Sequence, residues 1–544
     1  MKGMVREMIN IGIDSNAQKH LFCRHWQFGI GSGHAALALR SDYITLLKKV
    51  REELGITYVR FHGIFNEDMD VVRSLKDILP IRGAERFVEY NFEKIGTAYD
   101  NILSCGMKPF VELSFMPELL AGGSTKSGLF YRPNITPPAD YEQWGRFIER
   151  FIRYLTGRYG IEEVADWYFE VWNEPDLGVF FDGKKEDYFK LYEVTVRAVK
   201  TVDERLRVGG PATSASKWIG SFLEYCRVNH TPLDFVSTHQ YAGDPIGGFQ
   251  GGADLEAENE KVNLDFLKET DILVNPPQGT ILEGFRQIMQ DRSELVELPR
   301  DSFRKNAAAT ARMVKQQGSL TLFYTEWNAN AIFSASTNDT RKAAAYDVKA
   351  ALDTELTIDA SCVWCFSDLF EEFHHFQEEF HGGFGLLTSH GIPKPVYHAF
   401  VLLKEVGAYR LELEDDATDR EIGAAAFTEE RTVWVLLFRQ KMKQSQLPPE
   451  PFVVEIKTDE LPEALTVKKI DEFHGNPLKV WQELGAPVPA SEEQVEKIKK
   501  ESEVRGEVLD YVFEDGIVTF EGELSVNDVW LVRLDVAAGE RCET

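Results

Sequence analysis

The segment Trp-Tyr-Phe-Glu-Val-Trp-Asn-Glu-Pro, residues 167–175, places a carboxylate and a proline directly after an apolar run. Aromatic and β-branched residues dominate Trp167–Trp172, which predicts a buried β-strand. Pro175 cannot donate to a strand ladder, so the strand ends before it. Glu174 is therefore expected at the carboxyl end of a strand, the place where the active sites of β/α barrels lie.

Seven further β-type segments lie before and after this one, with amphipathic helical patterns between them. The eight predicted strands are Trp26–Gly31, Tyr58–Ile64, Pro109–Phe115, Trp167–Trp172, Arg207–Pro211, Asp234–Tyr241, Leu322–Trp327 and Ala360–Ser367. Strands that alternate with helices form parallel sheets, and eight of them can close into a barrel. The predicted fold class is α/β: a (β/α)8 TIM barrel.

Two of the intervening helices can be placed in more detail. Ser41 can cap a helix that runs to Leu54, and Gly55 supplies its C-terminal stop. A second helix carries an apolar stripe with helical spacing, which is expected to lie on the barrel and to end near Gly157. The stripe consists of Trp144, Phe147, Ile148, Phe151, Ile152 and Leu155.

The chain of 544 residues is too long for one ordinary domain, and its pattern changes after residue 400. Residues 15–400 are assigned to the barrel and the β-rich residues 401–544 to a C-terminal β-sandwich, with residues 1–14 a candidate addition to the sandwich. A charged helical segment, Ser491–Glu503, is expected to be solvated. The long connection at about 244–306 is interpreted as a functional rim or lid, with plain decoration as the alternative.

Composition excludes several classes of function. The formal net charge of −28 argues against nucleic-acid binding, which requires a basic footprint. No run of 18 apolar residues is present, so no membrane span is expected, and residues 1–18 lack the apolar core of a secretory signal. A cytoplasmic location is expected, unless a leader has been removed. Cys362 and Cys365 form a CxxC pair, but the apolar stretch Ala360–Phe366 around them favours a buried strand over a metal site.

A second carboxylate, in Thr325-Glu326-Trp327-Asn328, stands at the end of predicted strand seven as Glu174 does at strand four. Two glutamates at the mouths of two strands of one barrel face a shared cavity. Cleavage of a glycosidic bond needs such a pair, because one carboxyl protonates the leaving oxygen while the other attacks the anomeric carbon or activates water. Either glutamate alone could simply cap a strand end, but the pair favours the catalytic interpretation.

An ordered set of motifs extends over the whole chain. It comprises Gly31-Ser32-Gly33-His34, Arg60-Phe61-His62-Gly63, Phe110–Pro117, Phe169–Pro175, Val208–Pro211, Asp234–His239, Thr325-Glu326, Phe366–Glu372, Phe380–Leu386 and Ile470–Pro477. On these residues the chain resembles glycoside hydrolase family 39, especially its β-xylosidases. The resemblance implies a retaining exo-glycosidase, above all a β-xylosidase that releases xylose from xylo-oligosaccharides by double displacement.

The resemblance also implies roles for individual residues. Glu174 is expected to be the acid/base, Glu326 the nucleophile, and Asn173 the residue that binds the sugar 2-hydroxyl. The other expected substrate-binding residues are Arg60, His62, Phe115, His239, Tyr241, Trp364, Glu371 and Glu372.

Spacing supports part of this set. Arg60 and His62 share one face of a strand, as residues at i and i+2 do, and so do His239 and Tyr241. Phe115 and Trp364 are candidates for stacking on the sugar, but either could instead be a core residue, because aromatic side chains dominate protein cores. The adjacent Glu371 and Glu372 could equally lie on a solvated loop.

Two features depart from the β-xylosidases: the connection from His239 to Glu326 is long, and Trp327 stands where those enzymes usually carry tyrosine. Both leave substrate length and aglycone preference open. Alternatives to a β-xyloside are another glycoside, such as an α-L-iduronide or an arabinoside, and a non-catalytic carbohydrate-binding barrel. No metal or organic cofactor is expected, the expected partner is a glycoside substrate, and the resemblance implies a homo-oligomer, either dimer or tetramer.

Overall fold

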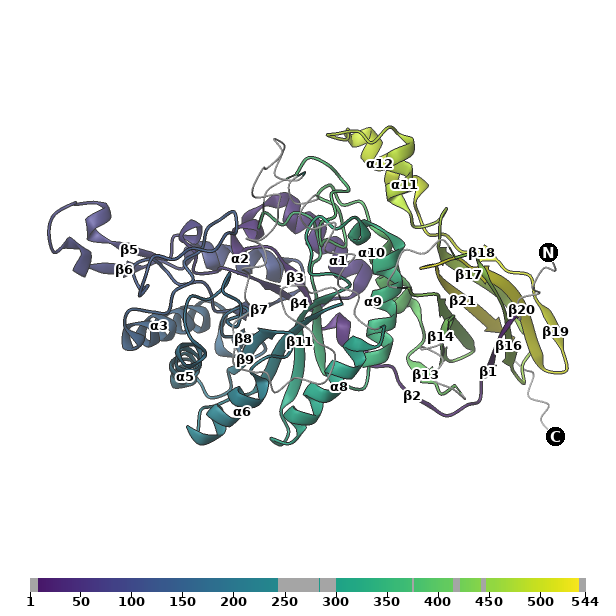
Figure 1. Ribbon diagram of the computed structural model, residues 1–544, viewed down its shortest axis with the longest axis horizontal. Helices are drawn as coiled ribbons and strands as arrows, with labels where there is room; N and C mark the ends of the chain where they lie inside the picture. The colour runs from purple at the N-terminus through teal and green to yellow at the C-terminus, as the bar shows by residue number, and fades with distance from the viewer. Residues whose placement is uncertain are drawn as a thin grey trace.

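The computed structural model describes residues 8–242, 283, 300–373, 376–413, 421–441 and 447–537. Figure 1 shows a helix-covered barrel joined to a domain built from sheets. Most of the predicted rim or lid, residues 244–282 and 284–299, lies outside the described residues. No helix in the described ranges combines the length and apolar character that a bilayer crossing requires.

Eight parallel strands close the barrel, as the sequence predicts. In spatial order they are β3 (Gly29–Ser32), β4 (Tyr58–Phe61), β7 (Lys108–Glu112), β8 (Tyr168–Glu170), β9 (Arg207–Ser214), β10 (Phe235–Tyr241), β11 (Thr321–Asn328) and β12 (Ala360–Val363). Trp26, predicted to begin the first strand, instead lies in a short 3-10 turn, His25–Gln27, before β3. Each strand points its carboxyl end to the same barrel face, which fixes where polar side chains converge.

Helices cover the outside of the barrel (Figure 1). They are α1 (Ser41–Leu54), α2 (Glu93–Ser104), α3 (Tyr141–Tyr159), α4 (Ile161–Val164), α5 (Lys185–Val202), α6 (Ile219–Val228), α8 (Ser302–Lys315), α9 (Arg341–Thr354) and α10 (Pro395–Glu405). The predicted stripe of α3 is buried along its whole length. The helix continues past Gly157, however, and ends at Gly160, whose φ of +81° suits a residue without a Cβ.

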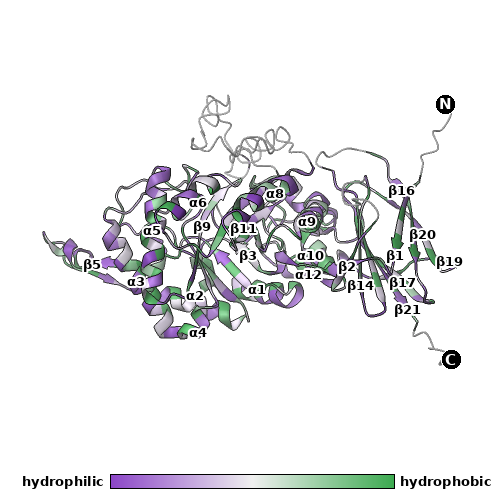
Figure 2. Ribbon diagram, turned by 90° about the horizontal axis from the view of Figure 1, so that it is seen from below, coloured by the Kyte–Doolittle hydropathy of each residue, from purple (hydrophilic) through white to green (hydrophobic). Residues whose placement is uncertain are grey.

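The second domain is a sandwich of a four-stranded and a seven-stranded sheet. The first sheet contains β1 (Ile9–Asp14), β16 (Glu450–Lys457), β20 (Ile517–Leu524) and β19 (Val512–Glu514). The second contains β18 (Glu507–Val508), β17 (Pro462–Ile470), β21 (Val529–Val536), β15 (Thr432–Phe438), β14 (Gly423–Glu429), β13 (Tyr409–Leu411) and β2 (Lys19–Leu21). Apolar residues, green in Figure 2, occur on strands of both sheets and form one shared core.

The N-terminal segment belongs to this sandwich. β1 pairs in parallel with β16, and β2 pairs with β13 of the other sheet. The predicted start of the barrel at residue 15 is therefore too early, because Lys19–Leu21 still lies in the second domain. Two short segments from the N-terminal end of the chain thus add a strand to each sheet of the C-terminal domain, a long-range pairing that local sequence patterns do not reveal.

Two helices of the C-terminal region pack back toward the barrel. These are α11 (Pro477–Glu483) and α12 (Glu492–Glu501). Val495 and Ile498 of α12 are buried in a cluster with Trp481 of α11 and with Phe380, which follows β12. The expectation of a fully solvated helix is therefore wrong for one face of α12, which its charged majority conceals in the sequence.

A hairpin of β5 (Val72–Ser74) and β6 (Val88–Tyr90) projects from the barrel between β4 and α2 (Figure 1). Inside the barrel, the amino end of the lumen is filled by a cluster of aromatic side chains. Its members are Phe28, Tyr58, Phe110, Tyr168, Phe235 and Phe323, with Ala360. The lumen is therefore packed rather than open at that end, as in other barrels of this size.

Candidate active site

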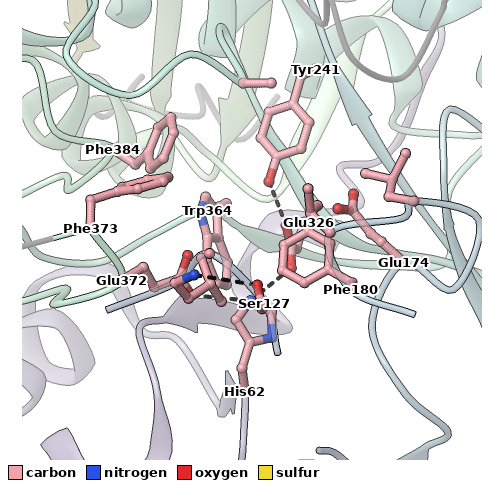
Figure 3. A pocket seen from close by; sticks show the side chains of 15 residues that line it. His62, Ser127, Glu174, Phe180, Tyr241, Glu326, Trp364, Glu372, Phe373 and Phe384 are labelled. Carbon is pink, nitrogen blue, oxygen red and sulfur yellow. Dashed lines mark hydrogen bonds and ion pairs between the residues drawn. The ribbon is translucent and has the colours of Figure 1, made fainter. Parts of the chain in front are cut away.

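Two glutamates meet at the carboxyl ends of β8 and β11. Glu326 lies within β11, and Glu174 follows β8 in a turn where Trp172 and Glu174 both have positive φ, +72° and +40°. One oxygen of each carboxylate and a ring nitrogen of His239 all lie within 4.8 Å of one another. Both carboxyl groups line one cavity of about 290 Å³ (Figure 3). Glu174 and Glu326 thus line the same cavity, as the sequence predicts.

Both oxygens of Glu326 are held by donors. Arg60 Nη1 donates to Oε1 at 2.7 Å, and the Tyr241 hydroxyl donates to Oε2 at 2.6 Å. Burial alone raises the pKa of Glu326, but the positive charges of Arg60 and His62 and the hydrogen bond from Tyr241 outweigh it and lower the pKa to about 2. Glu326 is therefore an ionised, fixed carboxylate at neutral pH.

Arg60 is the centre of this charged cluster, and its side chain is wholly buried. Besides Glu326 it contacts Glu170 at 2.6 Å and Glu112 at 2.9 Å, and it donates to Asn173 Oδ1 at 2.9 Å. A buried guanidinium is tolerated only when acceptors surround it in this way. One cation thus orients the nucleophile candidate and the residue before the acid candidate at the same time.

His62 links three carboxyl groups. Its Nδ1 lies 2.6 Å from Glu112, and its Nε2 lies 3.5 Å from Glu326 and 3.4 Å from Glu372. Burial lowers the pKa of His62, but the negative charge and hydrogen bond of Glu112 and the other carboxylates prevail and raise the pKa to about 9. Burial also raises the pKa of Glu372 to about 8, an effect that His62 only partly offsets. At neutral pH His62 is therefore cationic and Glu372 is a neutral acid.

His239 serves Glu174. Its Nδ1 lies 2.9 Å from Glu174 Oε1, and its Nε2 lies 3.5 Å from Arg60 Nη2. Because a guanidinium can only donate, Nε2 is the acceptor and Nδ1 carries the proton. Burial lowers the pKa of His239 and keeps the ring neutral. The neutral imidazole therefore donates a hydrogen bond to Glu174 and fixes its orientation.

The other expected residues divide between the cavity and its surroundings. Trp364 and Glu372 line the cavity, as expected. Phe115 does not line the cavity: it is fully buried behind the lining, where its ring packs 5.5 Å from that of Trp172. Glu371 does not line the cavity either, and it forms an ion pair with Arg40.

The family model described as glycosyl hydrolases family 39 matches residues 9–271 and 257–518. The chain belongs to glycoside hydrolase family 39. It is 36% identical over 519 residues to a β-xylosidase of Caldicellulosiruptor saccharolyticus, which covers 95% of this chain and 96% of the relative. A β-xylosidase of Geobacillus stearothermophilus is 33% identical over 543 residues, 97% of this chain and 96% of the relative.

A solved structure shares the whole architecture of this family 39 enzyme. The crystal structure of a monomeric β-xylosidase from Caulobacter crescentus CB15 aligns with a TM-score of 0.77 at 26% identity, covering 97% of this chain and 100% of the other. The resemblance predicted from the motifs and the barrel fold are both confirmed, and the protein is a glycoside hydrolase.

Trp327, one of the two departures noted in the sequence, lies away from the cavity of this family 39 enzyme. Its indole Nε1 donates to Ser361 Oγ at 2.9 Å, and its ring packs against Phe303 and Phe400 in the layer between barrel and helices. Trp327 therefore has no direct contact through which to alter the aglycone preference.

Sequence reasoning missed several residues of the site. Glu112 and Glu170 were not singled out, although each stands two residues after an aromatic residue of its strand and so shares its inward face. The missed lining residues give no such signal, because they lie on loops after the strands. They are Ser127, Gly128, Leu129, Leu177, Val179, Phe180, Ala331, Phe373 and Phe384.

Proposed function

We propose that this family 39 enzyme is a retaining exo-β-xylosidase that releases terminal xylose from β-xylosides, xylo-oligosaccharides among them, with Glu174 as acid/base and Glu326 as nucleophile. One observation carries the proposal: oxygens of the two carboxyl groups lie within 4.8 Å across a single cavity. Retaining glycosidases hold their carboxyls about 5–5.5 Å apart, whereas inverting enzymes need roughly 6.5–9.5 Å to admit water.

The reaction takes two steps. The Glu326 carboxylate attacks the anomeric carbon, the glycosidic C–O bond breaks, and Glu174 gives its proton to the leaving oxygen. Glu174 then takes a proton from water, whose oxygen attacks the same carbon and frees Glu326. Arg60 and Tyr241 keep Glu326 ionised and aimed, and the Asn173 amide nitrogen, buried with no hydrogen-bond partner among the described residues, suits the sugar 2-hydroxyl.

The lining favours a neutral sugar over a uronic acid. An α-L-iduronide carries a carboxylate, which sites of this kind bind through lysine or arginine. Among the described lining residues no side chain is lysine or arginine, and His62, the cation of the lining, already contacts Glu112 at 2.6 Å. The two relatives that match this chain over almost its full length are named β-xylosidases, which points to the same sugar.

The first test compares initial rates on aryl glycosides: β-D-xyloside, β-D-glucoside, α-L-arabinoside and α-L-iduronide, with Glu326→Ala as the blank. The expected result is preference for the β-D-xyloside and loss of at least about 10⁴-fold in the variant. Proton NMR of the first-formed xylose should show the β-anomer. Preference for another sugar overturns the xylosidase assignment, and an unaffected Glu326→Ala protein overturns the nucleophile.

A second variant tests the acid. Glu174→Ala should lose far more activity on an alkyl xyloside than on an aryl xyloside with a good leaving group, because only the former needs protonation. Equal losses on both substrates would contradict the acid role.

A cytoplasmic location and a dimeric or tetrameric state stay predictions. Light scattering coupled to size-exclusion chromatography measures the oligomeric state, with the monomeric β-xylosidase of Caulobacter crescentus CB15 as the comparison.

A further inference from the structure

We infer that the leaving-group side of the cavity takes an apolar aglycone, such as an alkyl or aryl alcohol, through contact with a wall formed by Leu129, Leu177, Val179 and Phe180. The inference rests on the proposed function and names the aglycone class of that same site. We call these four residues the acid-side wall. Their side chains line the cavity together with Glu174.

The position of the acid fixes where the leaving group lies. A general acid must come within about 2.6–3.2 Å of the oxygen that it protonates, so the first atoms of the aglycone sit beside Glu174. The chain turns directly after Glu174, where the Leu177 amide donates to the Glu174 carbonyl at 2.9 Å. This turn brings Val179 and Phe180, which belong to the same segment as the acid, to the cavity, where the Phe180 ring lies 6.2 Å from that of His62.

Most of the polar lining comes from other elements, although Ser127 lies two residues before Leu129 in the same loop. Tyr241 ends β10 and Glu372 follows β12, the two strands that flank β11 with Glu326, and His62 follows β4. These groups suit the hydroxyls of the sugar that Glu326 attacks. The acid-side wall, by contrast, offers four hydrocarbon side chains and no side-chain donor or acceptor.

The wall is preformed and accessible. Phe180 stacks on Phe115 with ring planes 6° apart, and its carbonyl accepts a hydrogen bond from the Trp172 indole at 2.9 Å. Val179 and Phe180 are only half-buried, so apolar surface remains for a ligand to cover. Phe115 and Trp172 thus support the acid-side wall from behind. The sequence alone did not connect either residue with the aglycone.

The chemistry of this wall separates two kinds of leaving group. A hydroxyl pressed against hydrocarbon loses its water without gaining a partner. A methylene in the same place gains up to about fourfold in binding when it is fully buried. An alkyl or aryl aglycone therefore gains from each added carbon, whereas the hydroxyls of a sugar leaving group gain nothing from the wall.

The test is a homologous series: kcat/KM for methyl, ethyl, propyl, butyl and hexyl β-D-xylosides, which break the same bond with similar leaving alcohols. We expect a rise of about two- to fourfold per methylene up to butyl, then a plateau once the wall is covered. Val179→Thr, nearly isosteric but polar, should flatten the rise. Val508→Thr makes the same change on exposed β18 and should leave the series unaltered.

Binding without chemistry gives an independent measurement. The inhibition constants of methyl and butyl 1-thio-β-D-xylosides on the unchanged enzyme should differ by about tenfold or more in favour of butyl. A flat series and equal inhibition constants, in an enzyme that cleaves the methyl xyloside, overturn the aglycone inference and leave the proposed function intact. Failure to cleave any xyloside overturns the proposed function, and the inference with it.

Discussion

The two ends of the barrel lumen are built from the same strands but from opposite chemistry. At the amino end, Phe110 and Tyr168 stack with centroids 5.8 Å apart in the aromatic cluster. Two residues further along the same strands, Glu112 and Glu170 each contact Arg60. A step of two residues along a strand keeps a side chain on the inward face and moves it about 6.6 Å toward the other end.

The two ends of the lumen therefore have different roles: the amino end stabilises the barrel, and the carboxyl end holds the candidate active site. The aromatic cluster fills space and tolerates changes of similar volume. The charged cluster depends on every partner, because a buried charge that loses its counter-charge has nothing to replace it. An exact side-chain geometry is therefore needed mainly at the carboxyl end, where β/α barrels place their chemistry.

The largest expected effect is that of Arg60→Met. The substitution leaves Glu112, Glu170 and Glu326 without their shared cation, which should destabilise the fold by about 3–5 kcal/mol and abolish xyloside cleavage. Chemical denaturation monitored by tryptophan fluorescence measures the first effect. A variant as stable as the unchanged protein would show that the two ends of the lumen do not differ in this way.

A smaller effect is expected from Glu112→Gln, and it depends on pH. Loss of the Glu112 charge lowers the pKa of His62 from about 9, so His62 loses its proton, and with it the positive charge beside Glu326, at a lower pH. The alkaline limb of kcat/KM should therefore move down by about one pH unit.

Rates measured between pH 6 and 10 check this shift. Ser114→Ala is the matched control, because it removes a hydrogen bond to Glu112 but keeps the charge. A uniform loss of kcat/KM at every pH in Glu112→Gln would indicate a merely structural role for this carboxylate.

Tyr241→Phe removes one of the two donors to Glu326. A hydrogen bond to a charged group contributes about 1.5–3 kcal/mol, so kcat/KM should fall by roughly ten- to a hundredfold. Tyr324→Phe, a change of a buried tyrosine of β11 whose hydroxyl faces Ser216 instead, should stay within a factor of about two. Equal losses in both variants would contradict a specific role for the Tyr241 hydroxyl.

The smallest effect is expected at the amino end of the lumen. Phe110→Leu should cost less than about 1.5 kcal/mol of stability, since the neighbouring rings can partly close the space. Xyloside kinetics should remain unchanged, because Phe110 does not line the cavity. A tenfold loss of kcat without loss of stability would mean that the aromatic cluster positions the charged one.

The sequence predicts those features that depend on local order along the chain. The apolar strand before Asn173, Glu174 and Pro175 predicts that Glu174 lies at the carboxyl end of a barrel strand. The same pattern at the end of another strand predicts this position for Glu326. Glu371 and Glu372 show where this reasoning stops. A positive φ of +54° at Glu371 turns the chain, so that one side chain reaches Arg40 while its neighbour enters the cavity.

The sequence alone thus determined the barrel, the family and the two carboxylates, because strand periodicity and strand-end chemistry are written in consecutive residues. Tertiary structure decided the rest. It brought β1 and β2 into the sandwich, gathered Glu112 and Glu170 around Arg60, and built the acid-side wall from loops. Such groupings join residues that lie far apart in the chain, and only closure of the barrel brings them within contact distance.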